Sequence, residues 1–334
     1  MIDAHVHLQP GDPGPLLERL AAFGADRFCA LGVPVVFGAD NNLRCLRLKR
    51  LYPGRAWAYG GLIWNRYGCP MPETQLGLLL DAGFDGLKLI ETKPNYQKEL
   101  GFLPDAPEFA PMFALAQERG APVTWHVGDP ATFWDNARAP GFAAENGWTY
   151  DGPGFMSLEE LYRRTENVLR AHPRLKATLA HLYFCSDDRA HLERVLAEFP
   201  EVSVDLTPGS EMYRDFAHDV AGWGAFFREH SLRIVLGTDM TNEPDDPHWR
   251  ELSLLTRAVL RHEPFEVWDL ASEGFDLGGE RVRAITGGNF TRLAGDSPKP
   301  INARGLATLM AFYHDHLDPA DYAACREVYE ESYA

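Results

Sequence analysis

The chain has 334 residues, enough for one large α/β domain or two domains of ordinary size. Hydrophobic residues make up 45% of it and charged residues 24%, which is typical of a globular protein that stays in solution. The 32 Lys and Arg against 48 Asp and Glu give a net charge of -16, which argues against nucleic acids and anionic membranes as partners, because both bind to basic surfaces.

The five cysteines are scattered and odd in number, and no CxxC pair occurs, so we expect a reducing compartment and no disulfide framework. No apolar stretch reaches the length of a membrane span. A histidine pair already begins at residue 5, which leaves no room before it for a signal peptide. These features predict a cytoplasmic protein.

Short apolar runs alternate along the chain with amphipathic stretches of helical period. We predict eight strands, within 2–8, 27–38, 56–64, 83–90, 121–129, 175–184, 202–209 and 232–240. The predicted helices lie at 15–24, 41–52, 72–83, 109–120, 158–173, 190–200 and 216–230. Alternation of this kind implies parallel strands with right-handed crossovers, and the first strand lacks the GxGxxG turn of a dinucleotide-binding sheet. The sequence therefore predicts an α/β protein, a (β/α)₈ TIM barrel, as a single domain over 1–334.

Two segments are longer than ordinary connections: 127–156 after the fifth strand and 240–249 after the eighth. In a barrel both would cover the C-terminal mouth, where the active sites of this fold form. The last part of the chain, from about 296 to 334, is expected to be a helical extension. It would pack against the barrel or against another copy of the chain, so a homo-oligomer is possible.

The opening "MIDAHVHLQP" places His5 and His7 on one face of the first strand, because residues i and i+2 of a strand point the same way. Such a pair alone is weak evidence for a metal site. Four further polar side chains lie on or at the ends of other predicted strands: Lys88, His126, His181 and Asp239. The C-terminal ends of all barrel strands meet at one mouth, so we expect these side chains to lie together. Imidazole and carboxylate groups are ligands of zinc, manganese and iron.

This pattern resembles the amidohydrolase superfamily, and within it the amidohydrolase 2 branch. That branch includes aminocarboxymuconate semialdehyde decarboxylase-like enzymes and various lactone and ester hydrolases. The resemblance runs from "IDAHVHL" to "ITGGNFTRLAG" at 285–295, through "LEELYRRTENVLRAHPRLKATLAHLYF" and "RIVLGTDM". Thr238 stands where the family more often has Ser.

The resemblance implies a divalent metal cofactor, zinc in the first place with manganese or iron as alternatives, as one or two ions. His5, His7, His126 and Asp239 would be its ligands. Asp239 would also take the proton from the water that the metal activates. His181 would either polarise the substrate or bind a second metal ion.

The resemblance leaves three roles open for Lys88, which lies in "GLKLIETKPN". It could be carbamylated and bridge two metal ions, it could bind a substrate carboxylate as an ammonium, or it could form an ion pair with Glu91.

The predicted loops contain weaker candidates. Arg66 could bind a substrate carboxylate through two hydrogen bonds. Trp134, with Trp148, Tyr150 and Trp249, could line the substrate pocket, although fixing the long loops in place is the preferred interpretation. Asp129 could orient His126, and Asp205 is expected to make a helix cap or a loop hydrogen bond.

Hydrolysis of a small-molecule ester, lactone or amide is the function that we expect. Non-oxidative decarboxylation or hydration of a small carboxylic acid is the alternative, and a catalytically inactive binding barrel is the third hypothesis. Arg66 and Lys88 are the only basic residues placed at the mouth, and this shortage of cations favours hydrolysis over decarboxylation. The fold alone does not decide between these chemistries.

Overall fold

The computed structural model describes residues 1–243 and 249–333. Eight parallel strands form one sheet in chain order: β1 (Ile2–Val6), β2 (Arg27–Leu31), β3 (Ala56–Gly61), β4 (Gly86–Thr92), β5 (Val123–Val127), β6 (Ala177–Leu179), β7 (Val202–Asp205) and β8 (Ile234–Val235). The sheet closes where Ala4 N donates to Leu236 O at 2.8 Å and His7 N donates to Met240 O at 2.9 Å. The predicted (β/α)₈ barrel is confirmed.

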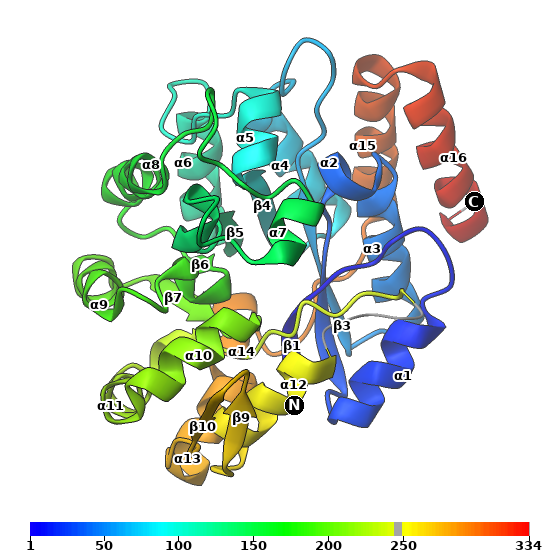
Figure 1. Cartoon of the computed structure of the whole chain (residues 1–334). Coiled ribbons are helices and arrows are strands. Elements are labelled where there is room, and N and C mark those ends of the chain that lie inside the picture. Colours follow the sequence, from blue (N-terminus) through cyan, green and yellow to red (C-terminus); the bar gives the residue numbers. More distant parts are fainter. Residues whose placement is uncertain (244–248, 334) are drawn as a thin grey trace.

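Helices surround these strands (Figure 1). Those up to β6 are α1 (Gly14–Phe23), α2 (Pro34–Phe37), α3 (Asn41–Leu51), α4 (Pro72–Ala82), α5 (Pro94–Leu100), α6 (Ala110–Arg119), η1 (Ala131–Trp134), α7 (Gly141–Glu145) and α8 (Leu158–Ala171). From β6 to β8 follow η2 (His181–Phe184), α9 (Arg189–Glu198), α10 (Ser210–His218), α11 (Val220–Glu229) and η3 (Ser231–Arg233). After β8 come α12 (Trp249–Leu255), η4 (Thr256–Leu260), the hairpin of β9 (Phe265–Val267) and β10 (Leu270–Ser272), α13 (Gly278–Arg283), η5 (Ala284–Gly288) and α14 (Asn289–Ala294). None of the described helices combines the length and apolar character that crossing a membrane requires.

The C-terminal extension consists of α15 (Ala303–His316) and α16 (Pro319–Tyr333), which lie on the outside of the barrel beside α3 and α4 (Figure 1). Gly305 allows α15 to approach α4 closely, because a Cβ there would lie 2.1 Å from the carbonyl oxygen of Asp81. Asn42 of α3 donates to the hydroxyl of Tyr313 at 2.8 Å. The extension therefore packs against the barrel of its own chain.

The interior of the barrel is polar on one side and apolar on the other. Lys88, Thr124, Thr178 and Ser203 are partners in register across β4 to β7, and all are buried. Partners in register point to one face of a sheet, and Lys88 reaches His5 across the barrel, so this polar row faces the interior. On β2 and β3 the interior face is apolar, where Trp57 and Tyr59 pack with Phe290 of α14.

Several predicted bounds are wrong. Only Arg27–Leu31 of 27–38 is a strand, and Pro34 begins the short helix α2. The single helix predicted at 216–230 is two helices, because Asp219 leaves the helical conformation and its side chain accepts a hydrogen bond from Gly222 N as the cap of α11. The α5 helix and the β9–β10 hairpin are not foreseen by the sequence patterns.

Of the two long segments, 127–156 contains η1 and α7 and has a small core of its own, formed by Phe133, Ala143 and Tyr150. The other segment, 240–249, includes residues 244–248, which lie outside the described residues.

Candidate metal centre at the mouth of the barrel

Side chains from β1 and from the segment after β8 bring three donor atoms together. The Nε2 atoms of His5 and His7 are 3.2 Å apart. Oδ1 of Asp239 lies 3.2 Å from Nε2 of His7 and 3.5 Å from Nε2 of His5. Ligand atoms that bind a tetrahedral ion at about 2.1 Å are about 3.4 Å from one another. The three atoms therefore have the spacing of ligands around one metal ion.

Hydrogen bonds on the far sides of the two rings set where their protons lie. Nδ1 of His5 is 2.8 Å from Oδ2 of Asp205, and Nδ1 of His7 is 3.0 Å from the carbonyl oxygen of Leu31. Both oxygens accept, so each neutral ring carries its hydrogen on Nδ1 and has a lone pair on Nε2. Two lone pairs and the Asp239 carboxylate then face one another, an arrangement that a metal cation between them would stabilise. The donor chemistry fits a divalent metal ion.

Burial keeps His5 neutral. Burial and, to a smaller extent, the charge of Lys88 lower the pKa of this ring to about 4, against the opposing effect of Asp205. A neutral imidazole is the form that binds metal.

Asp3 fixes the backbone beneath these ligands. Its carboxylate accepts hydrogen bonds from His5 N at 3.1 Å and from Thr238 N at 3.2 Å, and from the Thr238 hydroxyl at 2.5 Å. Asp239, which has a positive φ of 59°, donates its N–H to His5 O at 2.9 Å. Asp3 therefore joins β1 to the chain after β8 at His5, which is a ligand candidate, and at Thr238, which precedes Asp239. The sequence analysis missed this role, and the polar residue inside an apolar run was the available signal.

His126 and His181 form a second pair next to the first group. Nδ1 of His126 is 3.1 Å from Nε2 of His181, and the His181 ring centroid is 5.5 Å from that of His5. Among the described residues, the three-donor group consists of His5, His7 and Asp239 only. His126 thus lies with His181 rather than within that group.

Asp129 lies beside His126, but its hydrogen bonds go to other side chains, which the sequence analysis did not predict. Nε2 of His126 is 3.4 Å from Oδ1 of Asp129, whose two oxygens accept from Lys93 Nζ at 2.7 and 2.6 Å. The hydroxyl of Tyr150 also donates to Asp129. Burial alone would raise the pKa of Asp129, but Lys93 and His126 hold it well below its usual value. The long loop is thereby tied to the site through an ionised carboxylate.

Lys88 is buried in the barrel with Nζ 3.1 Å from Nε2 of His5. Burial lowers its pKa to about 8. The Glu91 carboxylate instead accepts hydrogen bonds from the indole of Trp64 at 3.2 Å and from Ile90 N at 2.9 Å. This geometry places Lys88 with the metal-binding candidates rather than in an ion pair with Glu91.

His181 begins a turn of unusual backbone conformation. The φ angles of His181, Leu182, Tyr183 and Phe184 are 55°, 54°, 61° and 52°, in the left-handed region, which costs about 1–2 kcal/mol for each residue of this chirality. His181 N donates to Oδ1 of Asp205 at 2.8 Å, and the Tyr162 hydroxyl donates to Tyr183 O at 3.0 Å. Strain held in place at a polar cluster is typical of functional sites.

The two loop candidates, Arg66 and Trp134, have other partners. Arg66 is exposed, with its guanidinium 4.7 Å from the ring centroid of Tyr67. Trp134 donates to Met156 O at 3.0 Å and packs against Tyr150, so it holds the long loop together. Trp148 lies over Lys93 Nζ at 4.5 Å. The side chain of Trp249 is outside the described part of the chain.

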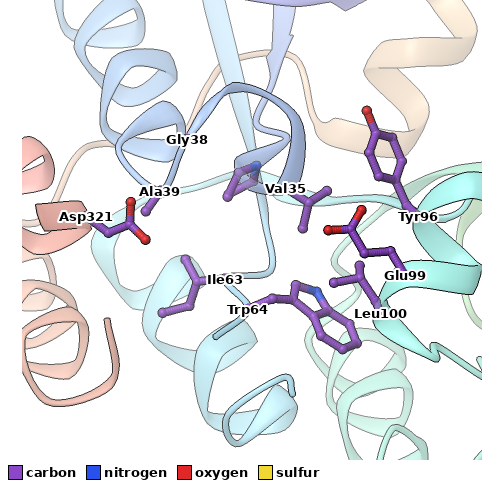
Figure 2. Close-up of a pocket in the computed structure, with 10 residues that line it drawn as sticks. Val35, Gly38, Ala39, Ile63, Trp64, Tyr96, Glu99, Leu100 and Asp321 are labelled. Carbon is purple, nitrogen blue, oxygen red and sulfur yellow. The ribbon is translucent and has the colours of Figure 1, made fainter. Parts of the chain in front are cut away.

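A cavity of about 270 Å³ lies between α2, the segment after β3, α5 and the start of α16 (Figure 2). Its apolar walls include Val35, Ile63 and Trp64, with Glu99 at one end and Asp321 at the other. None of its lining residues is Lys, Arg or His. The helix α2 also carries Phe37, whose ring is 6.1 Å from that of His7, so this helix borders both the cavity and the donor group.

Fold and donor set together define a (β/α)₈ barrel with a candidate metal centre at its C-terminal mouth. No family model matches the sequence, and no curated protein matches it. Several solved structures do share the fold.

A probable 2-pyrone-4,6-dicarboxylic acid hydrolase of Acinetobacter baumannii is 11% identical, with a TM-score of 0.55 over 88% of this chain and 98% of that one. A 2,6-dihydroxybenzoate decarboxylase of Rhizobium is 13% identical, with a TM-score of 0.52 over 87% and 97%. An amidohydrolase II is 18% identical, with a TM-score of 0.54 over 88% and 99%. At these identities the likeness shows the fold alone.

Proposed function

We propose that the protein is a metal-dependent hydrolase of the amidohydrolase type that cleaves an ester, lactone or amide bond in a small molecule. The observation that carries this proposal is the triangle of His5, His7 and Asp239, whose donor atoms are 3.2 to 3.5 Å apart. Zinc is the first candidate for the ion, with manganese or iron as alternatives.

A divalent ion at this triangle would supply Lewis acidity and make hydroxide available near neutral pH. Asp239 is the best placed of the three to exchange a proton, because 24% of its side chain is exposed, against 1% and 10% for His5 and His7. It accepts the proton of the attacking water and returns it to the leaving group. His181, beside His5, polarises the substrate carbonyl and stabilises the negative charge that develops on its oxygen.

His126 orients His181 through the contact between their ring nitrogens at 3.1 Å. The same spacing would also suit two ligands of a second ion, which is the alternative role of this pair. Lys88 would then supply the bridging group as a carbamate.

The distribution of positive charge favours hydrolysis over decarboxylation. A decarboxylase needs a cation for the departing carboxylate, but Lys88 contacts His5, Lys93 is paired with Asp129, and Arg66 is exposed over Tyr67. The cavity of Figure 2 contributes two carboxylates and no basic side chain. These features support a neutral or positively charged substrate.

A substrate panel tests the proposal. Protein loaded with zinc, manganese or iron is assayed with esters, lactones and amides, and in parallel with aromatic and unsaturated carboxylic acids for release of carbon dioxide. We expect turnover of at least one ester, lactone or amide, and loss of that turnover in Asp239→Asn. Release of carbon dioxide without any hydrolysis would replace the proposal by the decarboxylase alternative. Absence of both reactions in metal-loaded protein would favour the binding barrel.

A further inference from the structure

We infer that Asp205 is a positioning residue that sets the tautomer of His5 and anchors the backbone of His181 at the same time. The inference rests on the proposed metal centre, because its consequence is that Nε2 of His5 carries the lone pair that would bind the ion. The sequence analysis assigned Asp205 only a helix cap or loop hydrogen bond.

The two carboxylate oxygens of Asp205 serve different elements. Oδ2 is 2.8 Å from Nδ1 of His5 on β1. Oδ1 accepts from His181 N at 2.8 Å, and from the backbone and the hydroxyl of Thr207. Asp205 is 1% exposed, so water does not compete for these oxygens. A side chain at the end of β7 thus joins β1 to the left-handed turn that follows β6.

An ionised carboxylate accepts hydrogen bonds at both of its oxygens. His181 N and Thr207 N are fixed donors, so Oδ1 must accept. Oδ2 also accepts, so His5 must donate from Nδ1 and present the lone pair of Nε2 towards His7 and Asp239. His181 is the first residue of the four-residue turn with positive φ, and its N–H donates to Asp205. The same carboxylate therefore fixes the backbone position from which the His181 side chain extends.

An amide in place of the carboxylate reverses one of the two contacts. With its oxygen towards His181 N, the Asn side chain directs its NH₂ group at Nδ1 of His5, which must then accept and carry its hydrogen on Nε2. A ring with hydrogen on Nε2 cannot bind metal through that atom. With the amide reversed, the NH₂ group faces the N–H of His181 and displaces the turn. The Asp205→Asn substitution changes hydrogen positions while it preserves size.

The test is a histidine-tautomer measurement on metal-free protein combined with a zinc titration. Long-range ¹H–¹⁵N correlation spectra distinguish hydrogen on Nδ1 from hydrogen on Nε2, and the His5 signal is assigned by its loss in His5→Gln. We expect Nδ1–H in the wild type and Nε2–H in Asp205→Asn, with zinc affinity about 10- to 100-fold weaker in the variant. The matched control is Asp215→Asn on α10, a half-buried aspartate that accepts from the Ser186 hydroxyl, and it should keep the wild-type tautomer and affinity.

Wild-type tautomer and zinc affinity in folded Asp205→Asn would overturn the inference. Hydrogen on Nε2 of His5 in the metal-free wild type would also overturn it, and this measurement needs no variant that might fail to fold. Failure of the proposed function has a different signature. In that case the substrate panel shows no hydrolysis, or the wild type binds no zinc, while the His5 tautomer still reports on Asp205.

Discussion

Nζ of Lys88 lies 3.1 Å from Nε2 of His5, inside the barrel and away from solvent. This contact connects β4 to the atom that the proposed metal centre uses. Burial lowers the pKa of Lys88 to about 8, so an appreciable fraction of the amine is neutral near physiological pH. A neutral amine is the form that reacts with carbon dioxide, and an ammonium is the form that binds a substrate carboxylate.

The carbamate role of Lys88 predicts a change in metal content. We expect Lys88→Ala to reduce metal from two ions per chain towards one, because the bridging group is lost. Short carboxylic acids should partly restore activity by taking its place. Metal content that stays unchanged while KM rises would contradict the carbamate role and support the ammonium role.

Asp239→Asn should reduce kcat by about 10²- to 10⁴-fold, because the amide cannot accept a proton from the attacking water. Metal content is determined in the same preparation, so that loss of the ion and loss of the base are distinguished. Full activity of a metal-replete Asp239→Asn protein would exclude the proposed proton transfer.

Tyr150→Phe should loosen the loop 127–156, because it removes a hydrogen bond to the ionised Asp129 while the ring stays in the core with Phe133. Hydrogen bonds to charged groups contribute about 1.5–3 kcal/mol. We expect faster cleavage of this loop in limited proteolysis. Tyr67→Phe, at a side chain that is 82% exposed, is the control. Equal cleavage rates in the two variants and the wild type would show that the hydrogen bond does not hold the loop.

Glu211 makes stability depend on pH. Burial, with smaller contributions from the charges of Asp215 and Glu251, raises its pKa from 4.5 to about 7. The folded protein then binds more protons than the unfolded chain between these values, so its unfolding free energy falls as pH rises through this window. Glu211→Gln should therefore be about 1–2 kcal/mol more stable than wild type at pH 8, and equally stable at pH 4.5.

Urea unfolding at the two pH values measures this difference, with the exposed Glu118→Gln as control. A Glu211→Gln variant that is no more stable than wild type at pH 8 would contradict the assignment.

The alternation of apolar runs and amphipathic stretches was sufficient to predict the eight strands in order, because burial of both faces of a parallel sheet leaves a strong local signal. It was also sufficient to place Lys88, His126, His181 and Asp239 near one another, since parallel strands end at one mouth.

Relationships that arise only from packing could not be predicted in this way. Asp205 and His5 are 200 positions apart, and no local pattern indicates that their side chains meet. The pairing of Lys93 with Asp129, 36 positions away, is of the same kind. The left-handed turn at His181 contains no glycine, so the usual signal for positive φ is missing.

Metal analysis of the purified protein and of the His5→Ala/His7→Ala double variant tests the metal centre most directly. We predict at least one divalent ion per chain in the wild type and almost none in the double variant, with an unchanged circular dichroism spectrum, because the site is at the mouth of the barrel. His314→Ala, at an exposed histidine of α15, should retain the wild-type content. Equal metal content in the wild type and the double variant would contradict a metal centre built on His5 and His7.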